Sequence, residues 1–179
     1  MITWIVGLAG SGKSTLGRAV VDRLRRDGRT VVLLDGDAVR TVFGNDLGHG
    51  LADRMRNGSR IAGLCRLLED QGVEVVACVL AIDPERLAQN RREFGRYAEV
   101  FLDVPWEVLE ARDQKGLYSG ARAGRIQDVV GVDIPFPRPA APDLVLGADH
   151  AVEALERQVD RVVALMAPRS AQTPREPSP

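Results

Sequence analysis

The sequence predicts an α/β fold in which an open parallel sheet carries helices on both faces. Three observations lead to this fold class. Short apolar segments alternate along the chain with longer segments of helical spacing. Two of the apolar segments, residues 31–34 and 73–81, are nearly continuous, which is typical of parallel strands buried on both faces. The first apolar segment leads directly into a glycine-rich loop and a helix, so the alternation begins at the start of the sequence.

The apolar and helical patterns set the expected elements in order. Strands are expected at residues 3–6, 31–34, 73–81, 99–104 and 144–146. Helices are expected at 15–26, 59–71, 84–97, 105–113 and 150–166, the last beginning at His150. The helix at 59–71 is predicted from the apolar positions that share one side, which are Ile61, Leu64, Cys65, Leu67 and Leu68. Pro105 suits the first turn of its helix, where a missing N–H does no harm.

Two segments differ from this alternation. Residues 114–142 are rich in Gly, Arg, Lys and Pro and are long for a connection within a compact domain. We interpret them as a mobile basic lid, and a solvated surface loop is the alternative. Residues 168–179 contain four of the ten prolines and no apolar cluster, which predicts a disordered tail. Residues 1–167 are therefore expected to form one domain.

The composition excludes several classes of function. The formal net charge of −1 gives no overall attraction to nucleic acid or to an anionic membrane. No apolar run approaches the ~20 residues that a membrane-spanning helix needs, and no secretory pattern opens the chain. The cytoplasm is the expected location. Cys65 and Cys78 lie in apolar runs and are expected to be buried, reduced thiols without a metal or disulfide role.

The loop after the first strand carries the strongest functional motif. Residues 7–14 read G-x-x-x-x-G-K-S, the phosphate-binding P-loop, in which glycines let backbone N–H groups curl around phosphates. Lys13 is expected to reach the β- and γ-phosphates of ATP, and the Ser14 hydroxyl is expected to bind Mg²⁺. A glycine-rich turn before a helix is the alternative. The predicted ATP-binding residues of this loop are Gly7, Gly10, Ser11, Gly12, Lys13, Ser14 and Thr15.

Two carboxylates follow the second strand. Ligands bind beyond the carboxyl ends of the strands in such sheets, so Asp35 and Asp37 should face the triphosphate, as should the segment after Ala81. One carboxylate can hold the metal ion, for which Asp35 and Ser14 are the expected ligands. The other can accept a proton from an attacking hydroxyl, and the sequence does not say which of the two is this base. A turn that ends the strand is the alternative.

Basic residues follow at positions suited to an anionic acceptor. Arg54, Asn57 and Arg60 stand three residues apart, so on a helix they rotate gradually and could reach one cleft, together with Arg40. Arginine binds anionic groups through its planar set of donors. A solvated charged face is the alternative interpretation.

At this point the sequence resembles the adenylyl-sulfate (APS) kinases, P-loop kinases that phosphorylate the 3′-hydroxyl of adenosine 5′-phosphosulfate with ATP. The similarity covers most of the chain and includes L-D-G-D-A-V-R at 34–40, K-G-L-Y-x-x-A-R-A-G at 115–124 and G-V-D-I-P-F at 131–136. It implies a P-loop kinase-type three-layer sandwich with a lid, the cofactors ATP and Mg²⁺, and a homodimer. It also implies that Lys13, Asp35 and Asp37 are catalytic, and that Arg112 lies near the ATP base. The implied acceptor-binding residues are Asp37, Arg40, His49, Arg54, Asn57 and Lys115.

The departures from the family pattern fall in the acceptor pocket. Family members usually have Phe at the positions of His49 and Val129, where the two rings clamp adenine, and Ser at the position of Ala81. Base–aromatic stacking is worth ~1–3 kcal/mol per contact, so these changes could weaken adenine binding roughly 10- to 1,000-fold. His49 could still stack, or it could be a polar loop residue.

Several functions therefore stay open. The best single candidate is phosphorylation of APS, followed by phosphorylation of another nucleotide-linked acceptor such as a cytidine diphosphate conjugate. A non-catalytic nucleotide-binding protein is a candidate of another class, although the intact Lys13, Ser14, Asp35 and Asp37 argue against it. A P-loop ATPase or GTPase switch is a further alternative, but the sequence lacks an N-K-x-D guanine motif.

Overall fold

The computed structural model describes residues 1–80, 82–147 and 152–167. Five parallel strands form one sheet in the order β2-β3-β1-β4-β5. They are β1 (Ile2–Val6), β2 (Val31–Asp35), β3 (Glu74–Val79), β4 (Tyr97–Leu102) and β5 (Leu144–Leu146). The fold class predicted from the sequence is confirmed. Ala81, His150 and the predicted tail at 168–179 lie outside the described residues.

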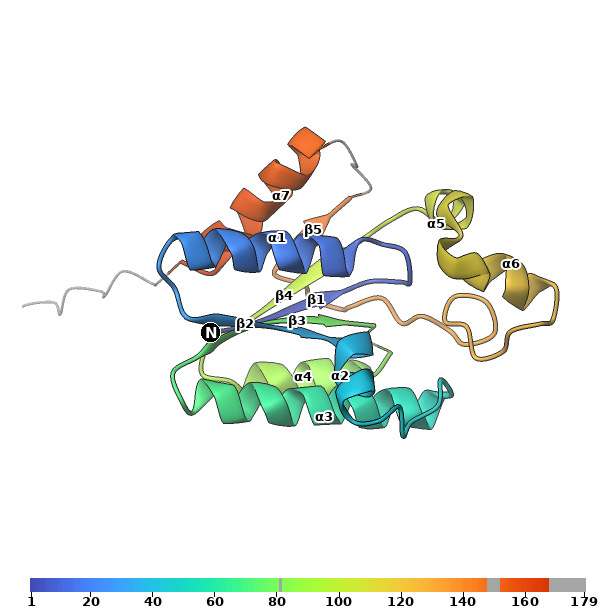
Figure 1. The fold of residues 1–179 in the computed structure, drawn as a ribbon, viewed down its shortest axis with the longest axis horizontal. Helices are drawn as coiled ribbons and strands as arrows, with labels where there is room; N and C mark the ends of the chain where they lie inside the picture. The colour runs from blue at the N-terminus through green and yellow to red at the C-terminus, as the bar shows by residue number, and fades with distance from the viewer. Residues whose placement is uncertain (81, 148–151, 168–179) are drawn as a thin grey trace, which may run out of the picture.

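Helices cover both faces of the sheet (Figure 1). On one face lie α1 (Lys13–Arg26) and α7 (Val152–Leu165), which pack over a core that includes Ile5, Val20 and Val76. On the other lie α3 (Leu51–Glu69) and α4 (Pro84–Glu93), over a core that includes Trp4, Ile61 and Val75. Because strand residues alternate between these two cores, each strand is apolar along nearly its whole length.

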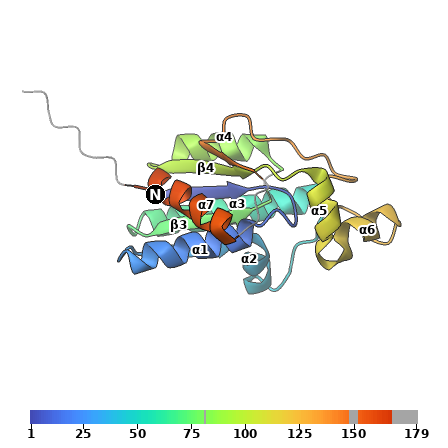
Figure 2. The ribbon, with the colours of Figure 1, turned by 90° about the horizontal axis from the view of Figure 1, so that it is seen from above.

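The segments beyond the carboxyl ends of the strands form a third group (Figures 1 and 2). They are the P-loop, α2 (Gly36–Val42), α5 (Trp106–Arg112), the 3₁₀ turn η1 (Gln114–Gly116) and α6 (Leu117–Arg122). A small apolar cluster joins α5 and α6 to the P-loop, with Leu109, Tyr118 and Val129 at its centre and Leu8 and Ala9 packed against it. The lid is thus attached to the P-loop by its own core.

Three sequence predictions about helices were wrong. The helix expected at 59–71 begins earlier, at Leu51. The sequence pattern missed this start because Leu51 and Met55 are exposed, so the first turns carry no buried apolar stripe. The helix expected at 84–97 ends at Glu93, because Phe94 takes an extended conformation and Tyr97 starts β4. The rings of Phe94 and Tyr97 stack with their centroids 6.0 Å apart. Their three-residue spacing, which resembles that of a helix, therefore belongs to the turn between α4 and β4.

The third error concerns the short elements. No helix was expected after β2 or within 114–142, yet α2 and α6 form there. The carboxylate of Asp35 caps α2, and the first turn of α6, which follows Gly116, donates backbone N–H groups to Asp113, which precedes the 3₁₀ turn. Asp35 Oδ1 accepts from Asp37 N at 3.0 Å, and Asp113 Oδ1 accepts from Tyr118 N at 2.8 Å. Such short helices are set by local capping, which a hydrophobic pattern over six or seven residues does not reveal.

Candidate active site

The P-loop has the backbone that its glycines predict. Gly10 and Gly12 have positive φ angles of 75° and 97°, which L side chains rarely adopt. A Cβ at Gly7 would lie 2.7 Å from Ser11 Oγ and 3.0 Å from the carbonyl oxygen of Leu102. The Ser11 hydroxyl is buried without a hydrogen-bond partner among the described residues. Thr15 lies exposed in the first turn of α1.

Lys13 lies within the curl of this loop. Its Nζ donates to the carbonyl oxygen of Leu8 at 2.7 Å. Burial lowers the pKa of Lys13 from 10.5 to about 8, while the nearby carboxylates of Asp37 and Asp35 act in the opposite direction. The desolvated Lys13 ammonium is suited to bind phosphate, because each negatively charged phosphate oxygen offsets the free-energy cost of its desolvation.

Ser14 and Asp35 meet directly, although they come from different elements. The Ser14 hydroxyl donates to Asp35 Oδ2, and the other carboxylate oxygen accepts from the backbone N–H of Asp37. A hydroxyl and a carboxylate beside a phosphate loop form an all-oxygen donor set, which Mg²⁺ uses together with nucleotide phosphates. The Asp37 side chain is exposed at the start of α2. The roles of Ser14 and Asp35 as metal ligands and of Asp37 as proton acceptor stay predictions.

Two arginines, Arg40 and Arg54, lie close enough to Asp37 and to each other to interact electrostatically. Arg40 Nη1 donates to the carbonyl oxygens of Leu47 at 3.2 Å and Gly48 at 2.8 Å. Arg54 donates to the carbonyl oxygens of His49 at 2.5 Å and Asp128 at 2.7 Å. In the part of the chain that the structure describes, neither guanidinium has a carboxylate partner within ion-pair distance. Burial, and then the charge of Arg40, lower the pKa of Arg54, as expected for two unneutralised neighbours.

The other two predicted residues of this group, Asn57 and Arg60, have different partners. Asn57 is buried, and its Nδ2 donates to the carbonyl oxygen of Gly36 at 3.3 Å while its Oδ1 has no partner among the described residues. Arg60 forms two hydrogen bonds with the Asp46 carboxylate, at 3.0 and 2.8 Å, and lies over the ring of Phe43. Arg60 is therefore paired with Asp46, unlike Arg40 and Arg54, and the expectation that it reaches the same cleft stays a prediction.

The two departures from the family pattern occupy different surroundings. His49 is exposed, and its pKa is lowered by partial desolvation and by the charges of Arg54 and Arg40. Val129 is 1% exposed and packs in the lid core with Leu109 and Tyr118. The structure therefore leaves His49 exposed near Arg40 and Arg54, while Val129 is buried with Leu109 and Tyr118.

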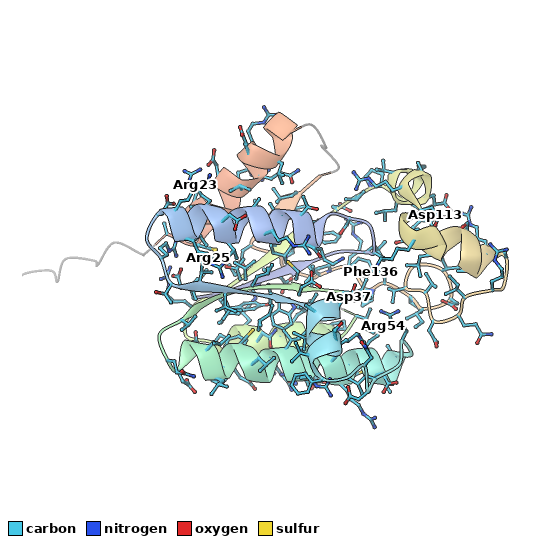
Figure 3. The ribbon with its side chains drawn as sticks, in the orientation of Figure 1. Arg23, Arg25, Asp37, Arg54, Asp113 and Phe136 are labelled. Atoms are coloured by element: carbon cyan, nitrogen blue, oxygen red, sulfur yellow. The ribbon has the colours of Figure 1, made fainter. Side chains whose placement is uncertain are left out.

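Two of the predicted site residues, Arg112 and Lys115, lie in α5 and η1. Arg112, at the end of α5, donates to the carbonyl oxygen of Gly10 at 2.9 Å. Lys115 is exposed in η1 with a positive φ of 62°. Figure 3 shows Asp37 and Arg54 at the end of the sheet that faces Asp113 and the lid, whereas Arg23 and Arg25 lie at the other end.

Sequence reasoning missed two contacts that join the lid to the rest of the site. The Tyr118 hydroxyl donates to the carbonyl oxygen of Ala9 at 2.8 Å, and its ring meets Trp106 edge-on at 4.9 Å between centroids. The Asp128 carbonyl is the second acceptor of Arg54. Tyr118 lies within the K-G-L-Y run and could have been found there, but a contact made by the Asp128 backbone leaves no signal in the sequence.

A cavity of about 210 Å³ opens next to the P-loop at the carboxyl end of β4. Its lining includes Leu8, Trp106 and Phe136, and Arg138 lies over the Phe101 ring at its edge. The second cavity, of about 20 Å³, lies between α3 and α4 beside Trp4 and Arg86. Within the described part of the chain, every helix is too short or too polar to cross a lipid bilayer.

Comparisons with known sequences agree with this geometry. A family model described as adenylylsulphate kinase matches residues 1–147. An adenylyl-sulfate kinase of Paraburkholderia xenovorans is 39% identical over 164 residues, which cover 91% of this chain and 90% of that protein. A bifunctional CysN/CysC enzyme of Xylella fastidiosa is 42% identical over 161 residues, which cover 88% of this chain and 26% of that longer enzyme.

Solved structures give the same result. The structure of Mycobacterium tuberculosis APS kinase CysC in complex with AMPPNP and APS has a TM-score of 0.85 at 37% identity, covering 92% of this chain and 96% of that one. A hexameric APS kinase from Thiobacillus denitrificans has a TM-score of 0.65 at 25% identity, covering 92% of this chain and 28% of that one.

Proposed function

The chain belongs to the adenylylsulphate kinase family, and from this premise we propose that it transfers the γ-phosphate of ATP to the 3′-hydroxyl of adenosine 5′-phosphosulfate. The observation that carries the proposal is the contact between Ser14 and Asp35, made beside Lys13 and next to Asp37. These groups are the parts that a phosphoryl transfer needs: a phosphate cradle, an oxygen donor set for the metal ion and a proton acceptor.

The donor half of the site rests on the P-loop. We propose that the backbone N–H groups between Gly7 and Thr15 hold the phosphates of ATP and that the Lys13 ammonium binds the β- and γ-phosphates. Ser14 and Asp35 would hold Mg²⁺, which neutralises charge on the phosphate oxygens when bound. Arg112, already bonded to the Gly10 carbonyl, lies where it can cover the nucleotide from the lid side.

The transfer itself needs only one proton acceptor. The acceptor hydroxyl oxygen forms a bond to the γ-phosphorus while the bond from that phosphorus to the β,γ-bridging oxygen breaks, which releases ADP. Asp37 takes the hydroxyl proton, because its side chain is exposed and its backbone N–H is held by Asp35. Lys13, and Lys115 from the lid, stabilise the negative charge that develops on the phosphoryl oxygens.

The acceptor half is proposed from the unneutralised arginines. Arg40 and Arg54 bond only to backbone carbonyls, so an anionic acceptor gains two guanidinium partners without breaking an ion pair. Asn57 offers a buried carbonyl oxygen and His49 an exposed ring in the same region. A second acceptor class, another nucleotide-linked small molecule, is favoured by one observation: Val129 is buried in the lid and presents no ring to a base.

The decisive experiment measures ADP release with purified protein, Mg-ATP and a panel of acceptors. The panel contains APS, AMP, and cytidine and uridine diphosphate conjugates, and each product is identified by mass. Turnover with APS at the lowest KM supports the main proposal. A lower KM for another nucleotide conjugate supports the second acceptor class. ATP binding without turnover on any acceptor would reject a kinase of this substrate class and would indicate a non-catalytic nucleotide-binding protein.

We also propose that the enzyme is a homodimer and is located in the cytoplasm. A homodimer is expected from the family, and light scattering of the purified protein tests it. A cytoplasmic enzyme is consistent with Cys65 and Cys78, which are buried free thiols, since reduced thiols persist in that compartment.

A further inference from the structure

Cys78 lies beneath the P-loop at the carboxyl end of β3, and the proposed reaction does not use it. Its residue is 3% exposed. In the sheet register Cys78 stands directly opposite Asp35 of β2. Its thiol donates to the carbonyl oxygen of Lys13 at 3.2 Å, in the first turn of α1. One buried side chain therefore contacts the helix that begins with Lys13 and Ser14, while its backbone is paired with the strand that ends in Asp35.

On the side of α1, the residue that faces the Cys78 sulfur is a glycine, Gly17. A Cβ at Gly17 of α1 would lie 2.3 Å from Cys78 Sγ and 3.1 Å from Leu33 Cδ1. The sulfur therefore occupies the volume that a side chain at position 17 would need, and α1 rests on β3 at contact distance. Because protein interiors are close-packed, a larger side chain at either position must move α1 away from the sheet.

We propose that Cys78 is a positioning residue that sets the distance between Ser14 and Asp35, the two groups assigned to the metal ion. This inference rests on the proposed function, because that function gives Ser14 and Asp35 their role. Ser14 belongs to α1 and Asp35 to β2, and β3 lies between β2 and the strand that leads into the P-loop. The separation of the two oxygen donors therefore depends on how closely α1 approaches β3, which the contact between Cys78 and Gly17 determines.

The thiol is well suited to this place because it is small and uncharged. Burial, and then the negative charge of Asp35, raise the pKa of Cys78 to about 12, so the group stays protonated beside the carboxylate and keeps its hydrogen for the Lys13 carbonyl. Cys78 touches neither nucleotide nor acceptor in this arrangement. Its effect on the reaction is exerted through Ser14 and Asp35.

The chain contains a matched control in its second cysteine. Cys65 lies on α3, is 0% exposed, and has a pKa raised to about 12 by burial and by the charge of Glu69. It packs in the core on the opposite face of the sheet from α1. Substitutions at Cys65 therefore disturb a buried thiol to a similar degree without touching the helix that carries Ser14.

The test measures how much Mg²⁺ strengthens nucleotide binding. AMPPNP is titrated into each variant by calorimetry, once with Mg²⁺ and once with EDTA, and the ratio of the two dissociation constants is compared. In Cys78→Val the ratio should fall about tenfold, the usual scale for loss of a group that orients metal ligands. In Cys78→Ser, which keeps a small donor, the ratio should stay near the wild-type value. In Cys65→Val the ratio of the two dissociation constants should also stay near the wild-type value, even if the melting temperature falls.

A second pair of variants keeps the proposal testable if Cys78→Val does not fold. Gly17→Ala should lower the ratio, and the double variant Gly17→Ala with Cys78→Ala should recover it, because removal of the sulfur makes room for the new methyl group. An unchanged ratio in folded Cys78→Val, an equal fall in Cys65→Val, or no recovery in the double variant would overturn the proposal. This titration contains no acceptor. Its outcome therefore does not depend on whether any acceptor in the turnover panel is phosphorylated.

Discussion

The Ser14 hydroxyl donates a hydrogen bond to the Asp35 carboxylate across 21 positions of sequence. Ser14 lies in the first turn of α1, and Asp35 is the last residue of β2, two strands away from β1 in the sheet. The contact exists because parallel strands end at the same edge, where a loop from one strand can meet a carboxylate from another. Asp35 then fixes the backbone N–H of Asp37 at 3.0 Å and so places the second carboxylate.

Asp37→Asn should abolish transfer while leaving nucleotide binding intact. The substitution keeps the size of the side chain and the backbone bond to Asp35, but it removes the proton acceptor. Loss of a general base typically costs ~10²- to 10⁴-fold in rate, so kcat should fall on that scale. Steady-state kinetics and AMPPNP titration measure the two effects. Asp70→Asn, an exposed acid at the end of α3, is the charge-matched control. A kcat within a few-fold of wild type would exclude Asp37 as the base.

Nucleotide affinity should decline as pH rises through about 8, the pKa of Lys13 in the free protein. Above this pH the buried ammonium loses its proton and its attraction for the triphosphate. Binding should restore the proton, so calorimetry at pH 9 in buffers of different ionisation enthalpy should detect proton uptake. Lys13→Arg, which stays charged, should lose both the uptake and the decline. Equal heats in all buffers for the wild type would contradict the assignment.

The same pKa shift affects stability with a defined sign. The Lys13 pKa is lowered from 10.5 in the unfolded chain to about 8 in the folded one, so the unfolded state binds more protons between these values. The contribution of Lys13 to the free energy of unfolding should therefore rise with pH over this window. Urea titrations of wild type and Lys13→Met at several pH values measure the difference.

Arg54→Ala should raise the KM for the acceptor much more than the KM for ATP. A hydrogen bond to a charged group contributes ~1.5–3 kcal/mol, which corresponds to an increase of roughly 10- to 150-fold. The variant also releases the carbonyls of His49 and Asp128, so it separates the acceptor loop from the lid. Arg56→Ala is the control, because Arg56 is exposed on the same helix and forms a long ion pair with Asp53, at 3.6 Å. Similar acceptor KM values for both variants would remove Arg54 from the acceptor site.

His49→Phe should distinguish an adenine-containing acceptor from others. A phenyl ring in place of imidazole should strengthen stacking by ~1 kcal/mol, which lowers the KM for APS roughly fivefold if adenine lies against this position. Because the pKa of His49 is lowered below 6.5, the ring is neutral at pH 7 and the substitution changes no charge. The KM values for APS and for a cytidine conjugate are compared in wild type and variant. A larger improvement for the cytidine conjugate would favour the second acceptor class.

Much of the donor site could be predicted from residues 7–14 alone. The positive φ angles of Gly10 and Gly12 and the close packing at Gly7 are properties of the glycines themselves. The buried strands were equally clear, because continuous apolar runs have few alternatives to a sheet covered on both sides. The short helices and the true start of α3 were missed, since capping and exposed apolar residues decide them and leave no periodic signal.

The acceptor side depended on the tertiary structure. Sequence spacing treated Arg54 and Arg60 alike, but the fold places Asp46 against Arg60 and only carbonyl oxygens against Arg54. The sequence likewise grouped His49 with Val129, and the fold separates an exposed ring from a buried lid residue. Local chemistry by itself determined the phosphate loop, the strands and the candidate carboxylates, because each depends on a few adjacent residues. Only the tertiary structure decided which charges stay unneutralised and how closely α1 approaches β3, because both depend on partners far away in the chain.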